Sequence, residues 1–200
     1  MRITGGEFGG RNLKVPKSDA IRPTQDRVRE ALFNIIQFEV AGSEFLDLFA
    51  GSGAVGLEAL SRGAARVTFV ERERRHLAVL KENAEAIAGR TEDRRRETVA
   101  ADCYRWISTY AGSGFTIGFA DPPYALGEER GYAQVLATLA SRGVIRPGGL
   151  FIAEMTAVQS PEETPGWELV RDRTYGKTRL CIWRRLSSNV LTQQNHEKRP

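Results

Sequence analysis

The feature that most constrains the fold is a segment in which an apolar strand, a glycine-rich turn and a helix start follow one another without a break. Residues 45–60 read FLDLFAGSGAVGLEAL. Small residues at such a turn let the backbone approach a ligand closely, and the following helix presents free N–H groups and the positive end of its dipole. The segment therefore predicts a ligand-binding turn between a strand and a helix of an α/β protein.

The rest of the chain repeats this alternation of short apolar runs and helical stretches, as a parallel sheet with crossover helices requires. The predicted strands are 45–49, 66–70, 96–100, 115–120 and 150–154. The predicted helices between them are 54–62, 73–88, 103–110 and 131–142. Two later strand-like runs, 167–170 and 179–183, are separated by the turn-containing stretch RDRTYGK, which indicates an antiparallel hairpin at the sheet edge. We therefore expect a Rossmann-like, mostly parallel sheet of seven strands.

The domain organisation follows from length and local composition. With 200 residues and 22.2 kDa, the chain has room for one compact domain. Residues 1–24 are rich in Gly, Arg and Lys and predict an extended or short-hairpin arm, followed by an amphipathic helix over 25–38. We expect the arm and helix (1–38) to pack on a catalytic domain (39–186), with a flexible tail at 187–200.

Composition limits the compartment and the chemistry. No apolar run approaches eighteen residues and the first residues lack the apolar region of a secretory signal, so we expect a cytoplasmic protein without a membrane partner. Two cysteines without CxxC spacing and two histidines predict no metal site. The net charge of +4 and the 24 Arg against 5 Lys weakly favour an anionic partner, although codon bias explains the arginines equally well.

Three acidic residues follow or end consecutive predicted strands. Gly51, Gly53 and Gly56 satisfy GxGxxG, and Glu71 stands where a dinucleotide enzyme places its ribose-binding acid, so the segment fits an NAD site. It also fits an ordinary tight turn that binds no ligand. Asp47 distinguishes these cases, because dinucleotide-binding strands are normally apolar at that position. A carboxylate there suits the ammonium group that S-adenosylmethionine carries and NAD lacks. Asp102 is suitably placed to accept a hydrogen bond from the adenine amine.

The most specific motif is Asp121-Pro122-Pro123-Tyr124, directly after the strand 115–120. Two consecutive prolines stiffen the turn. A rigid carbonyl oxygen and a carboxylate that converge on one point suit an exocyclic NH2 group, whose lone pair they expose by favouring pyramidalisation. Tyr124 is placed to stack on the target base. The motif predicts methylation of a base amine.

The motifs DLFAGSG (47–53), Glu71 and DPPY (121–124), in that order, resemble the class I S-adenosylmethionine-dependent amino-methyltransferases. The arm RITGGEFGGRNLKVP, the segment RPTQDRVREALFNII and the ending YGKTRLCIWRR narrow the resemblance to the RsmD family, bacterial guanine-N2 methyltransferases of 16S ribosomal RNA. The resemblance runs from Arg2 to about Arg185. It implies the class I methyltransferase fold, S-adenosylmethionine as cofactor, and 16S rRNA as partner, within a 30S subunit or assembly intermediate; we expect a monomer.

The resemblance also implies roles for individual positions. The cofactor-binding positions are Asp47, Phe49, Ala50, Gly51, Ser52, Gly53, Glu71, Asp102 and Cys103. The catalytic positions are Asp121, Pro122, Pro123 and Tyr124. The RNA-facing positions are Arg11, Arg22, Thr24, Arg27 and Arg29. The family motif often ends in Phe where Tyr124 stands, a change that keeps the stacking face, and the Arg-rich stretch 90–97 matches nothing in the family.

Two other functions stay open at this point. An NAD(P)-dependent oxidoreductase would use the same glycines, but it has no need of Asp47 or of the DPPY motif. A non-catalytic RNA-binding assembly factor would keep the fold without turnover, and the intact DPPY motif argues against it. Asp121 does not identify the target base, because an Asp or an Asn accepts hydrogen bonds from any amine.

Overall fold

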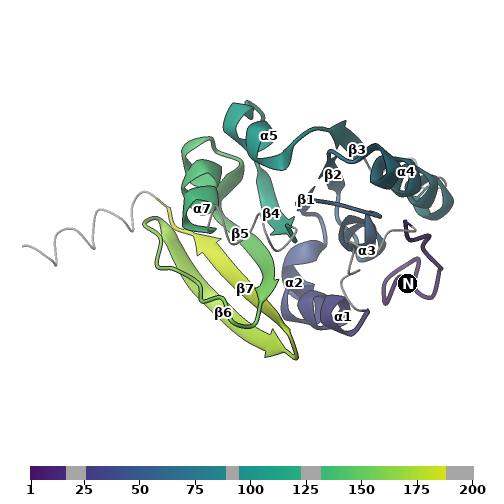
Figure 1. The fold of residues 1–200 in the computed structure, drawn as a ribbon, viewed down its shortest axis with the longest axis horizontal. Helices are drawn as coiled ribbons and strands as arrows, with labels where there is room; N and C mark the ends of the chain where they lie inside the picture. Colours follow the sequence, from purple (N-terminus) through teal and green to yellow (C-terminus); the bar gives the residue numbers. More distant parts are fainter. Residues whose placement is uncertain (17–25, 89–94, 123–131, 188–200) are drawn as a thin grey trace, which may run out of the picture.

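The protein is a three-layer α/β structure built on one seven-stranded sheet (Figure 1), in a computed structural model that describes residues 1–16, 26–88, 95–122 and 132–187. The strands are β1 (Glu44–Leu48), β2 (Arg66–Glu71), β3 (Arg95–Ala100), β4 (Phe115–Ala120), β5 (Ile145–Thr156), β6 (Trp167–Tyr175) and β7 (Thr178–Arg185). Their spatial order is β3-β2-β1-β4-β5-β7-β6. Strands β1 to β5 pair in parallel, and β7 runs antiparallel between β5 and β6. The predicted fold class is confirmed.

The helices cover the two faces of the sheet. They are α1 (Asp26–Ile35), α2 (Gln37–Val40), α3 (Ala54–Ser61), α4 (Arg74–Ala88), α5 (Cys103–Thr109) and α7 (Tyr132–Ser141). Helices α1 to α4 lie on one face, and α5 and α7 lie on the other (Figure 1). The first face packs around Phe33, Phe45 and Phe69, and the second around Phe115, Phe151 and Trp183. No helix in the described ranges is both long enough and apolar enough to cross a membrane.

Three elements differ most from the sequence prediction. The helix predicted over 25–38 is divided into α1 and α2 at Ile36. Strand β5 begins at Ile145, five residues before the predicted start, and includes the polar, breaker-rich stretch Arg146 to Gly149. Strand β6 continues through Tyr175, so that only Gly176 and Lys177 form the hairpin turn. Both strands were underestimated because their missing parts, RPGG in β5 and RDRTY in β6, lack apolar alternation.

The amino-terminal arm packs closely on the domain. A bridge between Arg2 and Asn12 closes it into a compact loop, and its apolar side chains Ile3, Phe8 and Leu13 are buried in the core cluster that includes α1 and α3. Backbone N–H groups of Glu7 and Phe8 donate to Ser61 at the end of α3. The arm therefore takes part in the hydrophobic core. Most of the predicted tail, 188–200, lies outside the described residues.

Candidate functional site

The glycine turn after β1 has the shape that its sequence predicts. Phe49, Gly51 and Gly53 have φ of 58°, 55° and 80°, a left-handed conformation that glycine adopts without strain and phenylalanine rarely adopts. Gly56 serves a different purpose, because a Cβ there would lie 2.3 Å from Phe69 on β2. The third glycine of the motif therefore allows α3 to pack directly against the sheet.

Hydrogen bonds to β2, α4 and α5 hold the turn. The N–H of Gly51 donates to Glu71 Oε2 at 2.8 Å, and the N–H of Phe49 donates to Cys103 Sγ at 3.2 Å. Behind the turn, the Asn83 side chain donates to Ser52 O at 2.9 Å and also to Lys14 O at 2.9 Å. Asn83 of α4, which sequence reasoning missed, therefore connects the arm to the turn. Its mid-helix position gave no signal.

Asp47 lies beneath the turn, as its place in the strand predicts. Its carboxylate is buried, and Oδ2 accepts a hydrogen bond from the N–H of Gly56, in the first turn of α3, at 2.9 Å. Burial raises its pKa to about 7, although the Gly56 hydrogen bond opposes the shift, and the charge of Glu71 raises the pKa further. A buried carboxylate with this pKa is suited to a cationic ligand group, because a cation would stabilise its ionised form.

Glu71 and Asp102 continue the row of acids toward β3. Glu71 Oε1 accepts hydrogen bonds at 2.8 Å from the N–H groups of Arg72 and Glu73, so both of its oxygens are used by backbone donors. Asp102 caps α5 by accepting from the N–H of Arg105 at 3.0 Å, and its second oxygen lies 3.6 Å from Arg72. Cys103 is buried, and burial raises its pKa to about 12, so its thiol stays neutral.

The DPPY motif begins at the same edge of the sheet. Asp121 and Pro122 directly follow β4, which lies beside β1 with Leu48 opposite Ala120. Because strands in a sheet are roughly 4.8 Å apart, the ends of β3, β2, β1 and β4 bring Asp102, Glu71, the turn and Asp121 into one row. Pro122 is buried and Asp121 is half-buried. Pro123 and Tyr124 lie outside the described residues.

A small apolar cavity of about 10 Å³ lies beside Ala120 and Pro122 on the α5 and α7 face. Its lining residues are Leu48, Phe49, Cys103, Tyr104, Ile107, Ala120, Pro122, Tyr132 and Val135. The ring of Tyr104 meets Phe49 edge-on, with centroids 5.5 Å apart. Tyr132 donates its hydroxyl to Glu154 O at 2.9 Å, and burial, followed by the charge of Asp121, raises its pKa. Sequence reasoning missed both tyrosines; for Tyr104, its position directly after Asp102 and Cys103 was an available signal.

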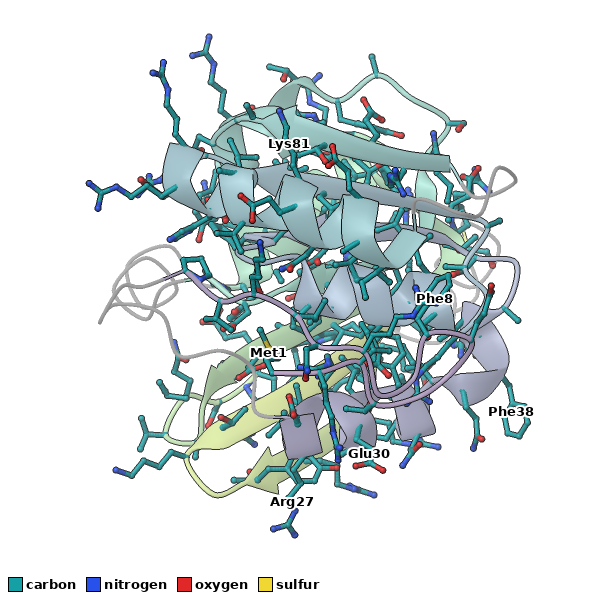
Figure 2. All side chains as sticks on the ribbon, turned by 90° about the vertical axis from the view of Figure 1, so that its right-hand side faces the viewer. Met1, Phe8, Arg27, Glu30, Phe38 and Lys81 are labelled. Carbon is teal, nitrogen blue, oxygen red and sulfur yellow. The ribbon has the colours of Figure 1, made fainter. Side chains whose placement is uncertain are left out.

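The predicted RNA-facing residues have different environments. Arg27 in the first turn of α1 is exposed and points into solvent (Figure 2). Arg11 is exposed, but its guanidinium donates to Ile87 O at 3.2 Å near the carboxyl end of α4. This helix leads back to the start of β3, so Arg11 lies at the edge of the sheet opposite Asp121 and does not join the site. Arg22 and Thr24 lie outside the described residues.

Arg29 requires a correction, because it does not face solvent. Its side chain is 0% exposed and forms an ion pair with the equally buried Glu58, with Nε 3.2 Å from Oε2. It also donates to Asp26 Oδ1 at 3.0 Å and to Arg2 O. The prediction took Arg29 for part of a basic surface, but two of its partners, Glu58 and Arg2, come from α3 and the arm, which sequence spacing does not reveal. Arg29 holds the arm and α1 against α3.

No group of three or more His, Cys, Asp or Glu side chains that could hold a metal ion occurs in the described ranges. The acids at the site instead accept hydrogen bonds from backbone N–H groups, as shown for Asp47, Glu71 and Asp102.

Comparisons with known proteins agree with this geometry. The model of the family described as "Conserved hypothetical protein 95" matches residues 1–184. Ribosomal RNA small subunit methyltransferase D of Escherichia coli (strain K12) is 34% identical over 186 residues, covering 92% of this chain and 90% of that protein. Its Haemophilus influenzae counterpart is 34% identical over 178 residues, covering 88% and 89%. The solved structure of a candidate methyltransferase from E. coli has a TM-score of 0.79 at 34% identity, covering 94% of this chain and 99% of that one.

Proposed function

The chain belongs to the family of the ribosomal RNA small subunit methyltransferase D proteins and is an S-adenosylmethionine-dependent methyltransferase of small-subunit ribosomal RNA, and we propose that it methylates the exocyclic N2 amine of a guanine in 16S rRNA. The observation that supports this most is the juxtaposition of Asp121 and the Asp47 turn at the ends of adjacent strands β4 and β1. The oxidoreductase alternative is not favoured, because it leaves both Asp47 and Asp121 without a role.

The residues at the carboxyl edge fit the methyl donor. When bound, S-adenosylmethionine supplies a methyl group on a sulfonium, which is reactive without a general acid. Asp47 would hold the ammonium group, Glu71 the ribose hydroxyls and Asp102 the adenine amine. Gly51 keeps the turn free of a side chain, since a Cβ there would meet only Phe49 O at 3.9 Å, whereas Gly53 lets the turn pack against Leu80. The half-buried rings of Phe49 and Tyr104, with centroids 5.5 Å apart, present apolar surface beside the turn against which a planar ring could pack.

On the RNA side, Asp121 and the carbonyl oxygen of Pro122 would accept hydrogen bonds from the target amine. These acceptors orient the amine and favour pyramidal nitrogen, so that its lone pair points at the methyl group. Positioning and electrostatic preorganisation of this kind lower a barrier by several kcal/mol. Tyr124 would stack on the target base once that base has left the RNA helix.

We propose that the protein acts as a monomer in the cytoplasm, where small ribosomal subunits assemble.

Transfer of labelled methyl groups from S-adenosylmethionine tests the substrate. The acceptors are 30S particles and naked 16S rRNA from a strain that lacks this methyltransferase, with fully modified 30S particles as control. We expect label in 16S rRNA of the first two samples only, and stronger labelling of 30S particles would indicate that bound ribosomal proteins form part of the recognised surface. Equal labelling of the control, or no labelled RNA, would contradict the proposal.

The raised pKa of Asp47 predicts pH-dependent cofactor binding. In the free protein the carboxyl group is protonated below about pH 7, and a bound ammonium group requires the ionised form. We therefore expect the affinity for S-adenosylmethionine to rise up to tenfold per pH unit between pH 5 and 7, as measured by calorimetry. Asp47→Asn should weaken binding at pH 7 and remove this dependence. A wild-type affinity that is constant from pH 5 to 7 would contradict the role of Asp47.

The same pKa has a consequence for stability without ligand. Because the folded-state pKa lies above the ordinary value of 3.8, the folded protein holds this proton more tightly than the unfolded chain. The contribution of Asp47 to stability is therefore fully present below about pH 3.8 and is lost as the pH rises through about 7. Bound S-adenosylmethionine should offset this loss.

Arg27 provides a test of the amino-terminal RNA surface that we propose for residues 1–38. Helix α1 runs alongside α3, because Arg29 pairs with Glu58 in the middle of α3 and Phe33 packs under Arg62 at its end. Since α3 leads from the turn toward the amino edge of the sheet, the first turn of α1, with Arg27, lies toward the carboxyl edge. Arg27→Ala should weaken RNA binding and reduce the slope of log affinity against log salt by about 0.7 to 0.9. Arg11→Ala, at the opposite edge, is the matched comparison. An unchanged slope in the Arg27 variant would remove this residue from the RNA surface.

A further inference from the structure

The hairpin formed by β6 and β7 reaches the edge of the sheet that carries the proposed site. Strand β5 runs parallel to β4 and ends at Thr156, which pairs with Thr178, the first residue of β7. The hairpin turn, Gly176 and Lys177, therefore lies beside the carboxyl end of β5. Strand β5 is next to β4 and two strands from β1 in the sheet. In Figure 1, this end of the hairpin lies on the same side of the molecule as α1.

The hairpin also holds the charge surplus of the whole chain. Residues 167–185 contain six basic and two acidic side chains, a surplus of four that equals the net charge of +4. The rest of the chain contains the remaining 23 of 29 basic and 23 of 25 acidic residues, so it is neutral. A surplus concentrated in one element at the sheet edge is the pattern expected of a surface that binds a polyanion.

Three of the six cations are available to a partner. Arg171 and Arg173 on the edge strand β6 are exposed, and each guanidinium donates only to the preceding carbonyl oxygen, Val170 O at 2.7 Å and Asp172 O at 2.9 Å. Lys177 in the turn is exposed as well. None of the three forms an ion pair with a carboxylate in the described ranges.

The other three cations of the hairpin have structural partners. Arg179 forms a two-point ion pair with Asp172, at 2.8 and 2.6 Å, which lowers the pKa of that carboxyl group. Arg184 lies 3.1 Å from Glu39, and Arg185 donates to Ile145 O. Arg179, Arg184 and Arg185 therefore have partners within the protein, whereas Arg171, Arg173 and Lys177 remain available to a ligand.

The available arginines share a face of the sheet with α1. Arg171 pairs with Ile182 and Arg173 pairs with Leu180, and residues directly opposite each other in an antiparallel ladder point to the same face. Leu180 and Ile182 belong to the core cluster beneath α1 and α3. Arg171 and Arg173 therefore extend this face at the sheet edge, on the side that carries Arg27.

We propose that Arg171, Arg173 and Lys177, here called the hairpin cations, form a second phosphate-binding surface that holds the RNA strand next to the target nucleotide. This inference rests on the proposed function, because it assumes an RNA substrate at Asp121. Strand β6 is three strands from β4, roughly 14 Å at the usual spacing, which places the hairpin cations a few nucleotides from the reacting base. Guanidinium groups suit this task because they bind phosphate in a bidentate manner.

The test compares a triple variant, Arg171→Ala, Arg173→Ala and Lys177→Ala, with Arg142→Ala. Arg142 is exposed and follows α7 just before β5 begins, at the opposite edge of the sheet. RNA affinity is measured between 50 and 200 mM salt, together with kcat, KM for RNA and cofactor affinity. We expect the triple variant to raise KM for RNA about tenfold or more and to reduce the salt slope by about two to three. Its kcat at saturating RNA and its cofactor affinity should stay within twofold of wild type, and Arg142→Ala should match wild type throughout.

Analysis of the labelled nucleoside in the same samples distinguishes the two proposals. A reduced salt slope with label on a base other than guanine would support the hairpin surface and overturn the guanine assignment. An unchanged slope and KM with labelled N2-methylguanosine would overturn the hairpin surface and leave the proposed function intact. Since all three side chains are exposed, the variants should fold normally, and equal melting temperatures check this.

Discussion

Replacing Asp121 by alanine should reduce methyl transfer by about 10²- to 10³-fold or more, while the affinity for S-adenosylmethionine stays within a few fold of wild type. The reason is that Asp121 follows β4, whereas the residues proposed to hold the cofactor come from β1, β2 and the segment after β3. Removal of the carboxylate leaves the target amine with one acceptor fewer and without the orientation that exposes its lone pair. Single-turnover rates with saturating RNA measure the effect on chemistry separately from RNA binding.

Asp121→Asn is the matched control for this variant. It keeps the size of the side chain and one carbonyl acceptor, so it should retain more activity than Asp121→Ala. Near-normal turnover of the alanine variant would show that Asp121 does not handle the amine. A loss of cofactor affinity equal to the loss of rate would instead assign Asp121 to the methyl donor.

The second large effect concerns the ion network that joins the arm, α1 and α3. Glu58 is fully buried and accepts from the Thr4 N–H at 2.8 Å, the Thr4 hydroxyl at 2.7 Å, Arg62 Nε at 2.9 Å and Arg29 Nε at 3.2 Å. Glu58→Ala would leave the Arg29 guanidinium buried without its main counter-charge. We expect the free energy of unfolding to fall by about 3 to 5 kcal/mol, because breaking a buried pair by removing one partner leaves an uncompensated charge.

Lys14→Ala is the control for the network. Lys14 and Glu82 form an ion pair at 2.8 Å, but both side chains are largely exposed, at 72% and 55%. Pairs of this kind contribute at most about 1 kcal/mol. Chemical denaturation of both variants measures the difference. If Glu58→Ala unfolds with a free energy within about 1 kcal/mol of wild type, the network does not hold the arm in place.

The sequence allowed the chemistry-bearing edge to be predicted because strand ends are local features. The turn 49–53 and the place of Asp47 within the preceding strand follow from apolar alternation, glycine positions and the rule that ligands bind at the carboxyl ends of parallel strands. The structure confirms these strands, whereas the spatial order that puts β4, and with it Asp121, beside β1 was not predicted. The chemical roles of these residues stay predictions until the variants are measured.

What could not be predicted depends on contacts between distant segments or on exposed strands. Arg29 looked like part of a basic helix surface because its partner Glu58 is 29 positions away in the chain. Asn83, which connects Lys14 and Ser52, was hidden by its place inside a helix. Strand β6 was predicted too short because residues 171–175, RDRTY, show no apolar alternation, and this error concealed the basic edge that the hairpin presents.

The most direct measurement of the central claim is the identity of the nucleoside that receives the methyl group. 16S rRNA labelled by the wild-type protein is digested to nucleosides and separated against N2-methylguanosine, N6-methyladenosine and N4-methylcytidine standards, with Asp121→Ala as the control. The account predicts a single labelled product, N2-methylguanosine, that is absent with the Asp121 variant. Label on adenine or cytosine would keep amine methylation but contradict the guanine assignment, and label on a ring carbon or a ribose oxygen would contradict the proposed mechanism itself.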